Sequence, residues 1–281
     1  MKATPALLPF GRCFFAFNRT IITLLITNNQ QLITINRLQP TIAPSPRLTT
    51  ITLFGIKKGH VRWGLAQMGT SGPKLAKVPG LLFHKLLGSG RGRGFSIKPN
   101  FYRYGLLCTW ENEAAADNFF RSSELIKEYG QHTSESWTCY MHPLQSHGQW
   151  DKQEPFAPIV SAKYSSGPIA VLTRASINLL ALPNFWRFVP QSSKALDNAE
   201  GLICSIGLGE LPLIRQATFS IWESAEAMKN YAYRNPKHQE VIKRTRSENW
   251  YSEELFARFI VTRTEGTWNG TNPMQAIIAK L

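Results

Sequence analysis

Acidic residues are missing from the first part of this chain. Residues 1–110 contain 15 lysines and arginines but no aspartate or glutamate, and Glu111 is the first acid. Residues 111–281 hold 17 basic and 18 acidic residues, so the net charge of +14 belongs to the first part of the chain. A basic surface attracts phosphate, either of nucleic acid or of lipid headgroups.

Cysteine pairs and long apolar runs are also lacking. The four cysteines are far apart and form no CxxC motif: Cys13, Cys108, Cys139 and Cys204. This spacing argues against disulfides, structural zinc and covalently attached haem, and it favours a reducing compartment. No apolar run reaches the ~18–20 residues that a membrane-spanning helix requires. We therefore expect a cytoplasmic protein.

Several catalytic motifs are absent. The six histidines show neither HExxH spacing nor a two-histidine, one-carboxylate set, and GxSxG and GxxxxGK[ST] do not occur. GSGRGRG (88–94) therefore reads as a glycine-rich turn. Together with KVPGLLFHKLL (77–87) it forms a basic, amphipathic segment of the kind that rests on an anionic membrane surface. A nucleic-acid interface is the weakest alternative, because aromatic residues are not interleaved with the basic ones.

The chain divides into an extension and two similar halves. Residues 1–46 are rich in Thr, Asn, Gln and Pro, and we expect a poorly ordered N-terminal extension. Beyond it, YGLLCTWENEAAADNFFR (104–121) resembles RQATFSIWESAEAMKNYAYR (215–234), and Gly148 to Trp150 resembles Gly266 to Trp268. Self-similarity of this kind indicates an internal duplication. The expected units are residues 47–158 and 159–281.

Each half is expected to contain strands and helices in the order strand, helix, strand, helix, strand. The opening strands are predicted at HVRWGLAQM (60–68) and IAVLTRASI (169–177), from their period-two alternation. This order is typical of an α+β fold with ferredoxin-like units. The predicted architecture is a tandem duplication of such units that forms an α+β barrel-type sandwich.

A histidine lies on the apolar face of a predicted helix that begins near Asn235 and Pro236. His238 shares that face with Val241, at a spacing of three residues. An imidazole that points inward needs a backbone carbonyl, a carboxylate, a water or a metal as its partner. The positive end of the helix dipole disfavours imidazolium, which keeps the ring neutral, as metal ligation requires.

Several stretches together resemble the spheroidene monooxygenase family of carotenoid biosynthesis. They are LGSGRGRGF (87–95), LTRASI (172–177), FWRFVPQSS (185–193), GLICSIGLGELP (201–212), QATFSIW (216–222), HQEVI (238–242), WYSEELFARF (250–259) and GTWNG (266–270). The resemblance implies the fold of the dimeric α+β barrel monooxygenases. It also implies oxidation of an acyclic carotenoid end at C-2 to a hydroxyl, which a second round converts to a ketone.

The same resemblance implies a cofactor and a site. His238 would be the axial ligand of a b-type haem. A cofactor is needed because amino-acid side chains alone cannot oxidise an unactivated C–H bond. Arg174 would be a distal or propionate-binding group, and Trp186, Trp222 and Phe219 would line the pocket. Dioxygen, an external electron donor such as a ferredoxin, and a peripheral membrane surface are the implied partners.

Two other classes of function stay open. One is a cofactor-free or flavin-assisted barrel oxygenase that acts on a polyketide-like aromatic. The other is a non-enzymatic module that binds an apolar ligand or a membrane surface and retains carotenoid without turnover.

Overall fold

The structure is a computed structural model that describes residues 47–278, except for residues 95, 159–166, 195, 197 and 235. The side chains of residues 189–194, 233–234, 236–239, 242, 276 and 278 are not described either. The predicted extension, residues 1–46, lies outside the described part of the chain.

The first half is a four-stranded antiparallel sheet with three helices. Its elements are β1 (Leu48–Ile56), α1 (Val61–Leu75), β2 (Leu81–Gly90), β3 (Pro99–Trp110), α2 (Glu113–Ser122), α3 (Glu124–His132) and β4 (Thr133–Gly148). The strand order is β4-β1-β3-β2, which is the ferredoxin-like order. Asn112 and Ser123 cap α2 and α3, because their side chains accept hydrogen bonds from the backbone N–H groups of Ala115 and Leu125.

The second half repeats this arrangement. Its elements are β5 (Ile169–Ile177), the short helix η1 (Leu179–Ala181), α4 (Leu182–Lys194), β6 (Leu202–Leu211), β7 (Arg215–Trp222), α5 (Ala225–Arg234), α6 (Pro236–Ser247) and β8 (Tyr251–Gly266), followed by α7 (Gln275–Ile278). The strand order is β8-β5-β7-β6. None of the described helices is long and apolar enough to cross a bilayer.

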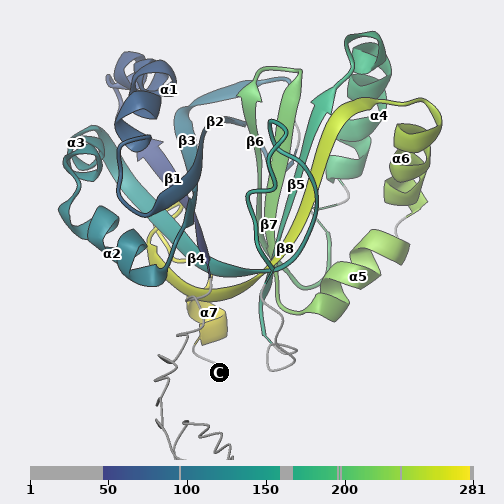
Figure 1. Ribbon diagram of the computed structural model, residues 1–281. Coiled ribbons are helices and arrows are strands. Elements are labelled where there is room, and N and C mark those ends of the chain that lie inside the picture. Colours follow the sequence, from purple (N-terminus) through teal and green to yellow (C-terminus); the bar gives the residue numbers. More distant parts are fainter. Residues whose placement is uncertain are drawn as a thin grey trace, which may run out of the picture. The chain divides into compact units, whose positions relative to one another are not determined.

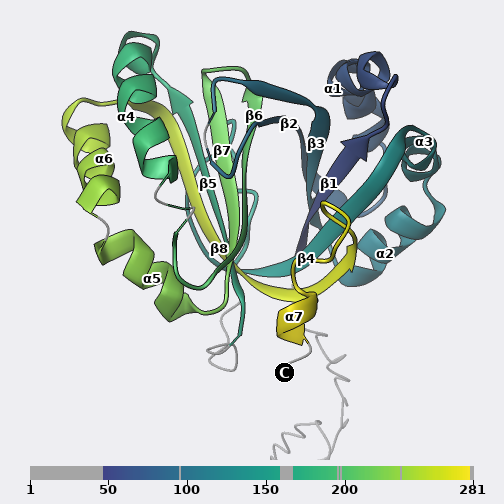
Figure 2. The same ribbon diagram turned by 180° about the vertical axis from the view of Figure 1, so that it is seen from behind.

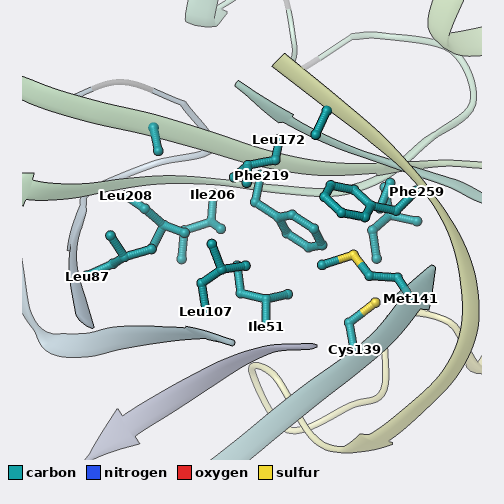
Figure 3. Close-up of a cluster of buried hydrophobic side chains, with 14 of the residues drawn as sticks. Ile51, Leu87, Leu107, Cys139, Met141, Leu172, Ile206, Leu208, Phe219 and Phe259 are labelled. Atoms are coloured by element: carbon teal, nitrogen blue, oxygen red, sulfur yellow. The ribbon is translucent and has the colours of Figure 1, made fainter. Parts of the chain in front are cut away.

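The two sheets close into one eight-stranded barrel, in which β2 pairs with β6 and β4 pairs with β8. Figures 1 and 2 show α1, α2 and α3 outside the first sheet and α4, α5 and α6 outside the second. Apolar side chains from both sheets fill the barrel, among them Ile51, Leu107, Leu172, Phe219 and Phe259 (Figure 3). The α+β barrel with duplicated ferredoxin-like units is therefore confirmed.

The glycine-tryptophan landmarks occupy equivalent turns. Gly148 ends β4 and Gly266 ends β8, both with positive φ, of 88° and 81°. A Cβ at either position would collide with a backbone carbonyl, so only glycine fits. Trp150 and Trp268 follow, and each forms an isolated bridge to a residue three positions further on.

Two expectations were wrong. Residues 60–68 belong to helix α1, not to a strand, and the opening strand is β1. The alternation in 60–68 is accidental: Gly64, Gln67 and Ser71 are buried at helical spacing. Each half also has four strands instead of three, because β2 and β6 precede the strands that end in Trp110 and Trp222.

The basic segment around GSGRGRG does not form an exposed apolar face. LLFHKLL lies in strand β2, where Phe83 and Leu87 point into the barrel and Leu81 and Leu86 pack beneath the helices of the first half. Residues 81–90 of the predicted amphipathic segment (77–94) thus form a strand that packs on both faces, and residues 91–94 begin the hairpin that follows.

Candidate functional site

Arg174 lies at one end of the barrel, inside a cluster of charged side chains. Its guanidinium contacts the carboxylate of Glu253 and is 3.3 Å from Glu210 and 3.7 Å from Asp151. Lys85, from the first half, contacts Asp151 and lies 3.3 Å from Glu210. The arginine side chain is 1% exposed, so these carboxylates neutralise a buried charge.

Hydrogen bonds and opposite charges in this cluster stabilise the ionised form of Glu253. Burial by itself raises the pKa of Glu253, but hydrogen bonds from the backbone N–H groups of Lys152 and Asp151, together with Arg174, outweigh it and lower that pKa. The opposite end of the barrel repeats the motif. There Glu135 accepts from the N–H groups of Asn269 and Gly270 and pairs with Arg103 at 2.9 Å. The repetition is typical of a structural lock on the turn that leaves each fourth strand.

The residues predicted for the site lie on both faces of the second sheet. Arg174 and Phe219 point into the barrel, as do their strand neighbours Leu172 and Ala217. Trp222 points to the helix side, where its ring centroid is 5.1 Å from that of Tyr231 on α5. The sheet therefore separates Arg174 and Phe219 from the helices that cover its outer face.

Trp186 and His238 belong to the covering helices. Trp186 is on α4, beside Phe185, and its indole N–H donates to the carbonyl of Leu213 at 3.1 Å. His238 is on α6, three residues before Val241, but its side chain lies outside the described residues. Its role as a ligand remains a prediction.

The outer faces of the two sheets differ in the size of their side chains. β1 pairs Leu48 with Trp110, and β5 pairs Ile169 with Trp222, which sets the register for matching the halves. Five matched helix-facing pairs lose bulk or become polar in the second half: Phe54 and Ala175, Leu86 and Gly207, Tyr104 and Gln216, Leu106 and Thr218, and Cys108 and Ser220; Thr50 and Val171 differ in the opposite sense. Bulk on the first sheet is thus replaced by small or polar groups on the second. We call Ala175, Gly207, Gln216, Thr218 and Ser220 the small-residue face.

Solvent reaches part of this face. All nine residues of β1 are buried, and so is β3 from Tyr104 to Trp110. On β7, the barrel-facing residues Ala217, Phe219 and Ile221 are at most 1% exposed, whereas Thr218 and Ser220 on the other side are half-buried. On the helix-facing side of β7, Thr218 and Ser220 are half-buried between the buried Gln216 and Trp222, whereas the matching part of β3 is fully buried.

Helices α4 and α6 cover the second sheet differently from the way α1 covers the first. α1 packs on β2 and β3, whereas α4 packs mainly on α6 and η1. Phe185 and Val241 meet at a small cluster with Ile177, at the end of β5. Glu248 holds this end by accepting hydrogen bonds from Trp250 and Asn184. Helices α4 and α6 are therefore anchored at the end of β5, on the side of the sheet that carries the small-residue face.

Such an arrangement suits a large, flat or elongated apolar ligand placed between sheet and helices. In the first half, Phe54, Leu86 and Tyr104 line a cavity of only about 10 Å³. The small-residue face was missed in the sequence, although the repeat contained it. On the helix-facing side of the aligned segments YGLLCTW and QATFSIW, Tyr104 and Leu106 are replaced by the less bulky Gln216 and Thr218, whereas Trp110 and Trp222 are the same.

The topology defines a single-chain α+β barrel whose two halves differ in the side chains on their helix-facing sides. The chain is 35% identical to spheroidene monooxygenase of Cereibacter sphaeroides over 82% of its own length and 72% of that protein. It is 36% identical to spheroidene monooxygenase of Rhodobacter capsulatus over 75% of its own length and 88% of that protein. The chain belongs to the spheroidene monooxygenase family.

Solved structures support the fold. The aldoxime dehydratase OxdRE, crystallised with butyraldoxime, superposes with a TM-score of 0.55 at 9% identity, over 83% of this chain and 85% of that one. At that identity the likeness concerns the fold alone. No protein-family model matches the chain.

Proposed function

We propose that this protein is a carotenoid monooxygenase that oxidises the C-2 position of an acyclic carotenoid end. The observation that carries the proposal is the small-residue face of the second sheet. Most of the equivalent positions of the first sheet hold larger apolar side chains. The small-residue face lies on the helix-facing side of the second sheet, where Thr218 and Ser220 are half-buried, and we propose that an apolar substrate and a cofactor bind there. Membership of the spheroidene monooxygenase family supports the substrate class.

The proposed cofactor is haem b, with His238 as its axial ligand. The residues fit such a group: Ala175, Gly207 and Thr218 lack bulk, Thr218 and Ser220 are half-buried, and Trp186 on α4 is a half-buried aromatic side chain. Bound haem would supply the oxidising power that side chains lack, with dioxygen and electrons from an external donor such as a ferredoxin.

The protein's own residues would bind, orient and keep the site dry. The small-residue face would accommodate the flat haem ring because positions 175, 207 and 218 carry no large side chain. The anchored end of α4 and α6, with Phe185 and Val241 against Ile177, excludes water from one side. Arg174 and Phe219 face the barrel and do not reach this space, so the proposed site does not include them.

Absorption spectroscopy of the full chain, produced with a haem precursor, tests the cofactor and its ligand. A Soret band near ~400 nm that is lost or shifted in His238→Ala would support an axial ligand at that position. His147→Ala, at an exposed histidine on β4, is the matched control and should leave the spectrum unchanged. Identical spectra for wild type and His238→Ala would reject His238 as the ligand.

Turnover separates this proposal from the alternatives. Formation of a C-2 hydroxylated product from an acyclic carotenoid, dependent on reductant and oxygen, is the expected result. Oxygenation that proceeds without any Soret band would favour the cofactor-free oxygenase. Stoichiometric carotenoid retention without product would favour a binding module.

A further inference from the structure

The β2–β3 hairpin of the first half is longer than its counterpart in the second. When the strand registers of the two halves are matched, Gly90 is equivalent to Leu211 and Arg103 is equivalent to Arg215. Twelve residues (91–102) lie between Gly90 and Arg103 in the first half, but only three (212–214) lie between Leu211 and Arg215 in the second. The barrel therefore closes without the additional length. We call residues 91–102 the long hairpin, of which residue 95 is not described.

Apolar and cationic side chains are exposed together on the long hairpin. Ile97 is 59% exposed, Phe101 45% and Tyr102 50%. Arg91 and Lys98 are exposed as well, and no acid occurs anywhere before Glu111. Large apolar side chains in water are unfavourable, so their grouping with cations is typical of an interaction surface.

The strand geometry explains why these side chains stand out. Gly88 pairs with Tyr104, but Ser89 pairs with Asn100, so the strand register skips Phe101, Tyr102 and Arg103 on β3. This irregularity interrupts the β2–β3 ladder at the base of the hairpin. Beside it, Lys57, Lys58 and Tyr102 line an open hollow of about 510 Å³. The nearby acid Glu135 is already engaged by Arg103 and two backbone N–H groups.

The long hairpin also touches the second half. The hydroxyl of Ser205 on β6 donates to the carbonyl of Arg93 at 2.7 Å. Ser205 is two residues before Gly207, and therefore on the same face of β6 as the small-residue face. A surface that meets the hairpin is thus next to the proposed site.

We propose that the long hairpin docks on an anionic bilayer surface. Ile97, Phe101 and Tyr102 enter the boundary between headgroups and acyl chains, while Arg91 and Lys98 contact lipid phosphates. Apolar substrate then passes from the bilayer to the small-residue face along β6. The charge of the hairpin matches anionic lipid, and its apolar side chains match the acyl layer. The transfer of substrate rests on the proposed function, whereas the docking does not.

Vesicle flotation of the full chain tests the docking directly. Wild type should float with vesicles of phosphatidylcholine and phosphatidylglycerol, float poorly with phosphatidylcholine alone, and lose binding as salt increases. The double variants Ile97→Asn with Phe101→Asn, and Arg91→Gln with Lys98→Gln, should each weaken binding by about tenfold or more. The matched control replaces Leu211 and Leu213 on the short hairpin, which are 46% and 43% exposed. Leu211→Asn with Leu213→Asn should bind as wild type does.

The possible results separate docking from catalysis. Equal flotation of the hairpin variants and wild type would overturn the docking proposal, as would loss of binding only in the Leu211 and Leu213 variant. Binding of wild type to heparin but not to anionic vesicles would assign the hairpin to another polyanion. If docking holds, the hairpin variants should oxidise carotenoid in detergent micelles at the wild-type rate but carotenoid in vesicles slowly. Absence of turnover in both media, with normal flotation, would contradict the proposed function and leave the docking intact.

Discussion

The two halves of the barrel share strand order, register and turn chemistry, but they use the space between sheet and helices in opposite ways. In the first half, Phe54 packs on Tyr129 with ring centroids 4.4 Å apart, and Trp110 packs on Phe119 at 5.1 Å. In the second half, the positions that match Phe54 and Leu106 are Ala175 and Thr218. The two copies of a duplicated unit therefore keep the same strand register with different packing between sheet and helices, and the proposed function places the ligand in the second copy.

The first prediction concerns packing in the first half. Phe54→Ala should lower the free energy of unfolding by about 3–5 kcal/mol, because the site is buried and the cavity cannot collapse fully. Chemical denaturation measures this loss. Phe101→Ala, at an exposed phenylalanine, is the control and should change stability little. A small effect of Phe54→Ala would show that the first half is not the tightly packed copy.

Arg174 provides the next test, because its two interpretations predict different readouts. Arg174→Ala removes a 1% exposed guanidinium and takes from the part-buried carboxylates of Glu253 and Glu210 one of their charged partners, so it should cost about 3 kcal/mol of stability. The Soret spectrum of the folded variant should not shift. A spectral change without loss of stability would restore Arg174 to a distal or propionate-binding role.

Exchanging bulk between the halves should affect binding in one half alone. Thr218→Leu copies Leu106 onto the small-residue face and should weaken haem or carotenoid binding by about 1–3 kcal/mol, through steric overpacking. The reverse exchange, Leu106→Thr, should destabilise the first half without a direct effect on binding. Titration monitored at the Soret band compares the two. Unchanged affinity in a folded Thr218→Leu variant would place the ligand elsewhere.

The smallest effect is expected from pH. The pKa values of Glu135 and Glu253 lie below the ordinary value, since hydrogen bonds from backbone N–H groups and a guanidinium outweigh the opposing effect of burial. Both carboxylates therefore stabilise the fold above the ordinary pKa of glutamate, and this contribution is lost as pH falls through the lowered values. Denaturation at pH 7 and at acidic pH should show a smaller acid-induced loss for Glu135→Gln and Glu253→Gln than for wild type. If the variants lose as much stability at acidic pH as wild type does, the carboxylates of Glu135 and Glu253 do not stabilise the fold in this way.

The sequence predicted the fold better than the site. The repeated tryptophans and Gly-x-Trp turns established the duplication because each landmark depends on a local requirement, such as the positive φ at Gly148 and Gly266. β1 was missed because LTTITLFGI mixes threonines with apolar residues and is buried on both faces. A buried strand of this kind shows no alternation.

The candidate site was only partly predictable for a related reason. Alternation in IAVLTRASI places Arg174 with Ala170 and Leu172, but a single strand cannot reveal which face meets the helices. That assignment requires the pairing of β5 with β7 and the closure of the barrel. Side-chain size at matched positions of the two halves became informative only once the register was known.

A crystal structure of the full chain purified with haem tests most directly whether the second half is the ligand-binding copy. We expect density for the group against Thr218 and Ser220, beneath α4 and α6. Density inside the barrel, or against the aromatic face of the first sheet, would contradict that division between the two halves.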